Sequence, residues 1–127
     1  MIRGKFFTQK TLQKNVEDWG IMGRISDPQV TGAKDLVVLD VELQPGKGHS
    51  FHKHPRQEEV LYVLHGNIEQ WVDGEKRILH PGDSAFVAAD VVHASFNVGD
   101  DNARILAILG PCVGEEGYEV VDAEGER

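Results

Sequence analysis

Turn-forming residues recur at short intervals along this chain, and their spacing constrains the fold more than any other feature. The clearest turns are Pro45-Gly46, Asp73-Gly74, Pro81-Gly82 and Gly99-Asp100. The runs between turns are short and rich in β-branched and aromatic residues, which favour strands. These runs cover residues 36–43, 60–64, 68–72, 78–79, 85–87, 92–97 and 104–109. Many short strands with turns about every 8–12 residues predict an all-β sandwich or barrel.

Two local patterns refine this prediction. Asp73-Gly74 lies between the runs 68–72 and 75–79 and indicates a β-hairpin, because a type I′ turn needs positive φ at both central residues. Residues 8–19 are the only segment in which we expect a short helix. Its apolar positions at helical spacing are Leu12, Val16 and Trp19.

The length of 127 residues suits one domain with a single hydrophobic core. We expect a barrel over residues 36–110, preceded by an N-terminal extension, 1–35. The remaining segment, 111–127, is rich in Asp and Glu. We expect it to be a solvated, partly mobile tail that takes no part in the chemistry.

Composition excludes several classes of function. The formal net charge is −8, which argues against a nucleic-acid partner, because phosphate contacts need clustered Lys and Arg. No run approaches the roughly 18 apolar residues that cross a bilayer, so we expect no membrane partner. The single cysteine, Cys112, allows no internal disulfide, and residues 1–11 lack the apolar stretch of a signal peptide. We therefore expect a cytoplasmic protein.

The run 60–64 (Val-Leu-Tyr-Val-Leu) is apolar at every position instead of alternating. A strand with one wet face alternates, so this pattern predicts a strand that is buried on both faces. One face would line the barrel. The other would be covered either by the N-terminal segment or by a second subunit, and a homodimer is the preferred interpretation.

All six histidines lie between His49 and His93, and the spacing of three of them indicates a metal site. His52 and His54 are two residues apart, so on a strand their imidazoles share one face, about 6.6 Å apart along the backbone. Glu59 opens the next run, and His93 joins them only if the chain folds back. Three imidazoles and one carboxylate suit one divalent ion of Mn, Fe, Co, Ni or Zn. An ion that favours six ligands would keep two positions for water, substrate or dioxygen.

These residues also carry a resemblance to a known family. The chain resembles the cupin superfamily, whose first motif reads G-x5-H-x-H-x3,4-E-x6-G. Its five fixed positions are occupied here by Gly46, His52, His54, Glu59 and Gly66.

The second cupin motif reads G-x5-P-x-G-x2-H-x3-N and is matched in part. Gly82, His93 and Asn97 stand at the expected intervals. Ala88 and Asp90 replace the proline and the second glycine, in the turn before His93. Asp tolerates left-handed turn conformations better than most residues, so the turn itself is expected to persist.

The resemblance implies a cupin-type jelly-roll β-barrel that holds one metal ion inside and frequently forms a dimer. The metal ligands that it implies are His52, His54, Glu59 and His93. It implies no particular reaction, since cupins include dioxygenases, decarboxylases, isomerases and proteins that only bind ligands.

Four further residues are candidates for the wall of a substrate pocket: His49, Gln70, Ser95 and Arg104. His49 either reaches the pocket mouth or is an exposed loop histidine. Ser95 shares the strand parity of His93, and Gln70 and Arg104 can respectively donate a hydrogen bond and bind a carboxylate. The apolar wall is expected from Leu61, Val63, Phe86 and Ile108.

The leading hypothesis is an enzyme that carries out oxygenase-type chemistry on a small chelating organic ligand, with Glu59 as the candidate catalytic base. Three alternatives stay open. They are a metal-dependent isomerase or lyase of decarboxylase type, a binding module that holds metal and ligand without turnover, and a protein with a purely structural ion. Oxygen uptake would separate the two kinds of enzyme, and product formation would separate enzymes from binders.

Overall fold

The computed structural model describes residues 2–127, and within them it contains only β-strands and one turn of 3-10 helix, so the all-β prediction is confirmed. No helix in this part of the chain is long or apolar enough to cross a membrane. The elements are β1 (Gln13–Glu17), β2 (Gly20–Ser26), β3 (Val37–Leu43), β4 (Gly48–Lys53), β5 (Glu58–His65), β6 (Ile68–Val72), β7 (Glu75–Leu79), β8 (Ser84–Val87), β9 (His93–Asn97), β10 (Ala103–Gly110), β11 (Val121–Asp122) and η1 (Glu124–Glu126).

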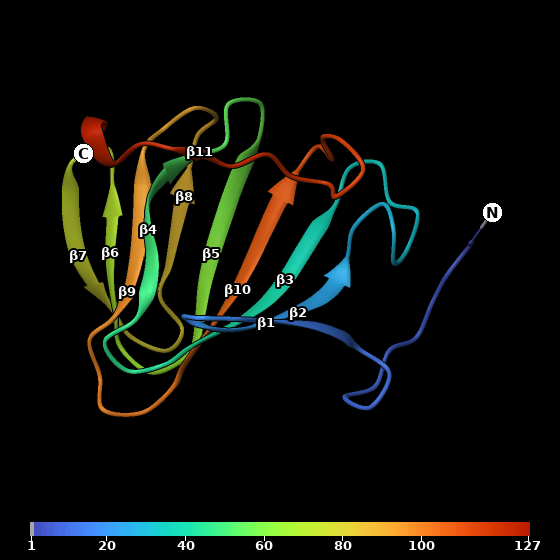
Figure 1. Ribbon diagram of the computed structural model, residues 1–127, viewed down its shortest axis with the longest axis horizontal. Helices are drawn as coiled ribbons and strands as arrows, with labels where there is room; N and C mark the ends of the chain where they lie inside the picture. Colours follow the sequence, from blue (N-terminus) through green and yellow to red (C-terminus); the bar gives the residue numbers. More distant parts are fainter. Residues whose placement is uncertain (1) are drawn as a thin grey trace.

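The strands form two antiparallel sheets (Figure 1). The larger sheet has the order β1-β2-β3-β10-β5-β8, and the smaller has the order β11-β4-β9-β6-β7. Neighbours in space are often distant in sequence: β10 pairs with both β3 and β5. This arrangement brings strands from the two halves of the chain together around one interior.

The predicted hairpin at Asp73-Gly74 is present between β6 and β7. Val72 and Glu75 face each other across the turn, and the φ angles of Asp73 and Gly74 are 51° and 82°. Both central residues therefore adopt the left-handed conformation that a type I′ turn requires.

The helix expected over residues 8–19 is wrong, because β1 pairs with β2 in an antiparallel hairpin instead. Val16, which would have belonged to the apolar helix face, is 82 % exposed on this strand. The hairpin turns over residues 18–19, and β2 then begins at Gly20, where a Cβ would lie 1.8 Å from the carbonyl oxygen of Glu42 on β3. Only glycine allows β2 to approach β3 this closely, and pairing with β3 overrides the weak helical spacing.

Side chains along β5 and β10 alternate between the interior and the exterior of the molecule. Leu61 and Val63 on β5, and Ile105 and Ala107 on β10, point inward and are buried. They belong to one apolar cluster that underlies the larger sheet. The rigid inner faces of these strands carry the side chains described below.

The outer face of β5 differs from the sequence expectation. Val60, Tyr62 and Leu64 are 38 %, 41 % and 40 % exposed in the single chain. The N-terminal segment does not cover them, since β1 and β2 lie at the opposite edge of the sheet from β8. Of the two covers that the sequence left open, the N-terminal segment is therefore excluded.

Candidate metal centre

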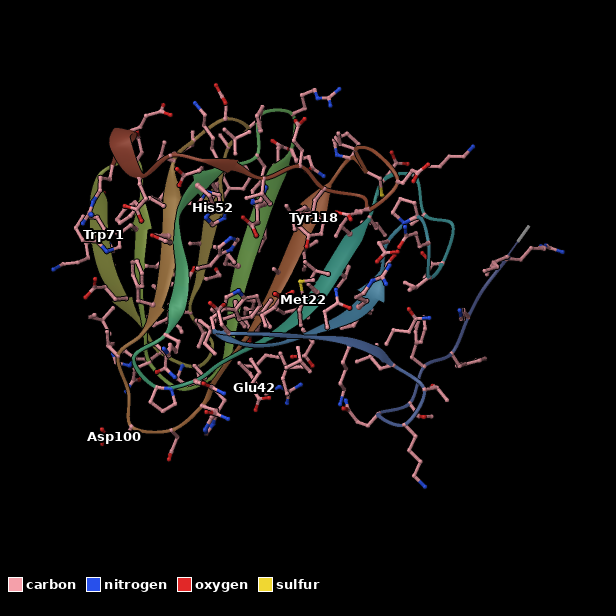
Figure 2. All side chains as sticks on the ribbon, in the orientation of Figure 1. Met22, Glu42, His52, Trp71, Asp100 and Tyr118 are labelled. Atoms are coloured by element: carbon pink, nitrogen blue, oxygen red, sulfur yellow. The ribbon has the colours of Figure 1, made fainter. Side chains whose placement is uncertain are left out.

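The four predicted ligands come from three strands and one turn at the same end of the molecule. His52 lies near the end of β4 and pairs directly with His93, the first residue of β9. His54 follows β4, and Glu59 is the second residue of β5. All four side chains are buried, and their donor atoms lie within 4.8 Å of one another. Strands that are far apart in sequence thus bring four potential ligands to one point (Figure 2, where His52 is labelled).

Hydrogen bonds to backbone carbonyls fix the orientation of the three imidazoles. The Nδ1 atom of His52 lies 2.6 Å from the carbonyl oxygen of Ser50, and that of His54 lies 2.7 Å from the carbonyl oxygen of Glu119. The Nδ1 atom of His93 lies 3.0 Å from the carbonyl oxygen of Val91. A carbonyl only accepts, so each Nδ1 carries the proton and each Nε2 keeps a lone pair. This is the orientation in which histidine binds a metal ion through Nε2.

Two of the inward atoms are acceptors without a donor. The Nε2 atom of His93 and the Oε1 atom of Glu59 are 2.8 Å apart, and both are buried with no hydrogen-bond partner. The same Oε1 lies 3.4 Å from the Nε2 atom of His54. With neutral imidazoles these facing lone pairs repel each other in the buried site unless a proton or a cation lies between them.

The electrostatics favour the protonation states that metal binding needs at Glu59 and His52. At His54, burial lowers the pKa, but the Glu59 carboxylate outweighs burial and raises it, so an ion must displace a proton there. Burial opposes ionisation of Glu59, but the imidazoles of His54 and His93 outweigh it and hold the pKa of the carboxyl at about 2. Burial, together with His49 and His93, lowers the pKa of His52 to about 2. Near neutral pH Glu59 is therefore an anion and His52 a neutral imidazole, both ready to ligate.

The donor set fits a divalent transition-metal ion. An ion with bonds of about 2.1 Å holds neighbouring donors about 3 Å apart, close to the separation between His93 and Glu59. Three nitrogens and one carboxylate oxygen suit Mn, Fe, Co, Ni or Zn, and the site offers no thiolate. The identity of the ion is not fixed by these residues.

The four side chains open onto a cavity of about 240 Å³ between the sheets. Its wall is largely apolar, with Leu39, Leu61 and Ile105 among its members. Such a cavity suits a small organic molecule that reaches the ligand cluster at its polar end.

Comparison with known proteins agrees with this geometry. A family model described as the cupin domain matches residues 39–109. This chain belongs to the cupin family. Its match includes all four clustered residues and strands β3 to β10, apart from the first two residues of β3 and the last residue of β10.

Two named relatives and one solved structure illustrate the likeness of this cupin to others. It is 29 % identical to polyketide synthase CurC of Streptomyces cyaneus, over 97 % of this chain and 80 % of that protein. It is 30 % identical to quercetin 2,3-dioxygenase of Bacillus subtilis, over 69 % of this chain but 26 % of that protein. The structure of KdgF from Halomonas sp. superposes with a TM-score of 0.74 at 24 % identity, covering 84 % of this chain and 94 % of that one. The last likeness concerns the fold alone.

The departures of this cupin from the second motif leave the turn before His93 in place. Asp90 stands where the motif has glycine and takes a φ of 67°. Its backbone N–H donates to the carbonyl oxygen of His54 over 3.0 Å. The turn that leads into β9 is thus tied to His54, a member of the candidate metal cluster.

His49 lines the cavity of this cupin, although simple alternation would turn it away from His52. The register of β4 against β9 shifts between these two residues, so His49 faces Ser95 while His52 faces His93. This bulge restores both rings to the same side. The ring of His49 stacks on that of His52, with centroids 3.7 Å apart, and faces Trp19 at 6.4 Å on the other side. His49 is thus exposed and also lines the cavity.

Ser95 and Gln70 occupy different depths. Ser95 lines the cavity, and its hydroxyl donates to the Oε1 atom of Gln70 over 2.6 Å. Gln70 is buried behind it and donates from Nε2 to the backbone carbonyl of Trp71. The structure therefore places Gln70 in support of Ser95 and not at the cavity surface, where the sequence predicted it.

Besides Gln70, four predicted wall residues do not line the cavity: Val63, which is buried in the apolar cluster, and Arg104, Phe86 and Ile108, which face outward. Arg104 sits on the outer face of β10, where its guanidinium donates to the Asp40 carboxylate, 3.2 Å from Nε to Oδ1. The prediction that Arg104 lines the pocket is wrong, because the inward face of β10 is carried by Ile105 and Ala107, and regular alternation turns Arg104 outward. Phe86 and Ile108 also face outward, opposite Val60 in the two flanking ladders.

Several cavity residues were not predicted from the sequence. Glu17, Trp19 and Met22 come from the β1–β2 hairpin, and Tyr118 and Val120 come from the C-terminal segment. Tyr118 and Met22, both labelled in Figure 2, are in contact, since the phenol donates to the Met22 sulfur over 3.6 Å. No local motif marks these positions, because they reach the cavity only through long-range pairing.

Proposed function

We propose that this cupin is a metal-dependent enzyme of oxygenase type that acts on a small chelating organic molecule. One observation carries the proposal: two buried acceptors, His93 Nε2 and Glu59 Oε1, face each other at 2.8 Å at the end of an apolar cavity. A divalent cation removes this conflict and leaves the cavity free for a ligand.

The chain's own residues would divide the work as follows. His52, His54, Glu59 and His93 would hold a divalent ion, which, if redox-active, supplies neighbouring positions where dioxygen and the oxygen atoms of a substrate meet. Glu59, an anion at neutral pH, would accept a proton from a hydroxyl of the substrate. Ser95 and His49 would orient polar groups of the ligand, while the apolar wall excludes water.

Substrate chemistry follows from the shape of the site. The ligand cluster, His49 and Ser95 supply polar groups to the cavity, and apolar side chains form most of its wall. A molecule with two adjacent oxygen donors on an apolar frame matches both parts. The name of the relative from Bacillus subtilis, quercetin 2,3-dioxygenase, supports a substrate of this kind.

Oxygen consumption tests the reaction type. Protein loaded separately with Fe²⁺, Mn²⁺, Co²⁺, Ni²⁺ or Zn²⁺ would be mixed with quercetin and with simpler chelating phenols, in air and under nitrogen. We expect oxygen uptake matched to product formation with at least one redox-active ion, and none with Zn²⁺. Turnover that persists under nitrogen with Zn²⁺ would point to a lyase or isomerase instead. Binding without product would reduce the protein to a binding module.

We further propose that residues 1–127 form one domain, a closed jelly-roll barrel, that works in the cytoplasm. Strand β1 pairs with β2, and β2 pairs with β3, which supports the inclusion of the N-terminal segment in the domain. The single cysteine, Cys112, is unpaired, as in proteins of reducing compartments.

A second copy of the chain is proposed as the cover of the outer face of the larger sheet. This apolar face is built from outward residues of three adjacent strands: Val60, Tyr62, Leu64, Phe86, Leu106 and Ile108. None of them is charged, so the face can meet itself across a two-fold axis without like-charge repulsion. The chain's own N-terminal segment lies at the far edge.

Substitution of Tyr62 by lysine tests this homodimer. Tyr62 pairs with Leu106 on one side and Ser84 on the other, so it lies inside the apolar face. In a dimer of Tyr62→Lys, the new lysine of each subunit would be buried in the interface without a partner of opposite charge. We therefore expect light scattering to show a monomer for this variant and a dimer for the wild type. Ile78→Lys, at an exposed position on β7 in the other sheet, is the matched control and should leave the mass unchanged. A monomeric wild-type protein at all concentrations would contradict the proposal.

A further inference from the structure

The C-terminal segment lies against the metal cluster although it falls outside the matched cupin domain. After β10 the chain turns back and crosses the end of both sheets, above β10, β5 and β4 (Figure 1). Its residues 117–119, here called the strap, run beside His54. This differs from the solvated tail that the acidic composition predicts.

One buried side chain holds the strap. Gln57, in the turn between β4 and β5, is 1 % exposed. Its Nε2 atom donates to the carbonyl oxygens of Pro111 and Gly117, over 2.7 and 2.9 Å. Its Oε1 atom accepts from the backbone N–H of Glu119 over 3.1 Å. Both amide protons and the amide oxygen are therefore committed to the C-terminal segment.

Glu119 connects the three hydrogen bonds of the Gln57 side chain, here called the clip, to the metal cluster. Its backbone N–H bonds Gln57, while its backbone carbonyl accepts from Nδ1 of His54 over 2.7 Å. The carbonyl selects the tautomer in which Nε2 of His54 has its lone pair free. Gln57 and His54 are also joined through the main chain, from the N–H of Gln57 to the carbonyl of His54 over 3.3 Å. A closed circuit of hydrogen bonds thus runs from Gln57 through the strap to a ligand.

We propose that Gln57 is a positioning residue of the metal centre, which clips the strap so that the Glu119 carbonyl holds the His54 ring in its ligating orientation. This rests on the proposed metal binding. The same clip keeps Tyr118, between Gly117 and Glu119, in the wall of the cavity. Because the coupling is reciprocal, an ion bound by His54 stabilises the closed strap.

A structural role alone would make a different prediction. If Gln57 served only to stabilise the fold, its loss would lower the melting temperature without altering the coordination of an ion. If it positions His54, its loss also weakens metal binding and changes the geometry at the ion. Partners behind a metal ligand are typically worth about 10–100-fold in metal affinity.

Cobalt binding to two variants separates these roles. Gln57→Met keeps the length of the side chain and removes all three hydrogen bonds. Arg56→Ala is the control: Arg56 contacts the same Glu119, but through an exposed ion pair of 3.3 Å with its carboxylate. With Co²⁺ as the probe, we expect about tenfold weaker binding and an altered visible spectrum for Gln57→Met, and wild-type values for Arg56→Ala.

Hydrogen exchange on the wild-type protein supplies a test that needs no variant. Addition of Co²⁺ should slow amide exchange in residues 117–119, with the Glu119 amide among them. Wild-type Co²⁺ affinity and spectrum in folded Gln57→Met, or unchanged exchange in the strap of cobalt-loaded wild type, would overturn the role of Gln57. Failure of the wild type to bind Co²⁺ would instead reject the metal site itself.

Discussion

His93→Ala should abolish stoichiometric metal binding while the fold persists. The Nε2 atom of His93 is buried, lacks a hydrogen-bond partner and lies 2.8 Å from Glu59 Oε1, so its main contribution is to the ion. Removal of one imidazole leaves two histidines and one carboxylate. We expect the affinity for Co²⁺ or Zn²⁺ to fall by more than about 100-fold. Loss of a residue that only forms a hydrogen bond to a metal ligand typically costs about 10–100-fold, and loss of the ligand itself should cost more. Elemental analysis after dialysis measures the change, from about one ion per chain to a small fraction.

A matched histidine shows whether the loss is specific. His65 lies on the outside of β5, is exposed and belongs to no metal cluster within residues 2–127. His65→Ala should therefore retain the wild-type metal content. Circular dichroism of His93→Ala should keep the β-sheet spectrum, because the apolar cluster does not include His93. Unchanged metal content in folded His93→Ala would show that the ligand assignment is wrong.

The cluster was predictable because most of its geometry is local. His52 and His54 are two residues apart at the end of a strand, and Glu59 opens the next strand after one turn. Short connections such as this one leave few arrangements. His93 is 34 positions beyond Glu59, and only the resemblance in the second motif tied it to the others.

Strand parity failed where the ladders are irregular. The bulge between His49 and His52 puts two side chains on the same face that regular alternation would separate. A bulge depends on the partner strand as well as on the bulged one, so a single sequence gives little sign of it. Arg104 lies outside the cavity for a different reason: β10 alternates regularly, but its inward face carries Ile105 and Ala107, so the prediction assigned the wrong face of this strand to the interior.

The outer parts of the cavity wall were out of reach for another reason. Trp19 arrives through the β1–β2 hairpin, in a segment whose spacing suggested a helix, and Tyr118 arrives through the strap. Both segments take their conformation from long-range partners: β3 for the hairpin, and Gln57 for the strap. Propensity within a short window does not contain that information.

Acid should destabilise the metal-free protein well before ordinary carboxylates titrate. The pKa of His52 is lowered by burial from 6.5 to about 2 in the folded chain, so below pH 6.5 the unfolded chain binds a proton that the folded chain excludes. Glu59, with its pKa held down at about 2 by His54 and His93 despite burial, adds the same effect below pH 4.5. His54 acts in the opposite direction, because Glu59 overcomes burial and raises its pKa, but its contribution is complete once the pH is below 6.5.

The free energy of unfolding should therefore fall by about 1.4 kcal/mol for each pH unit between 6.5 and 4.5, and about twice as steeply below 4.5. Against a total of about 5–15 kcal/mol for a typical domain, this loss is large. His49, on the exposed rim, shifts in the same direction, but solvent screening reduces its share. Urea unfolding of chelator-treated protein at pH 7, 6, 5 and 4.5, followed by tryptophan fluorescence, measures the slope. His52→Gln removes the titrating group. In this variant the slope of the free energy of unfolding against pH, between pH 6.5 and 4.5, should be smaller by about 1.4 kcal/mol per pH unit. A free energy that stays constant from pH 7 to 5 in the wild type would mean that His52 is not held neutral in the folded chain.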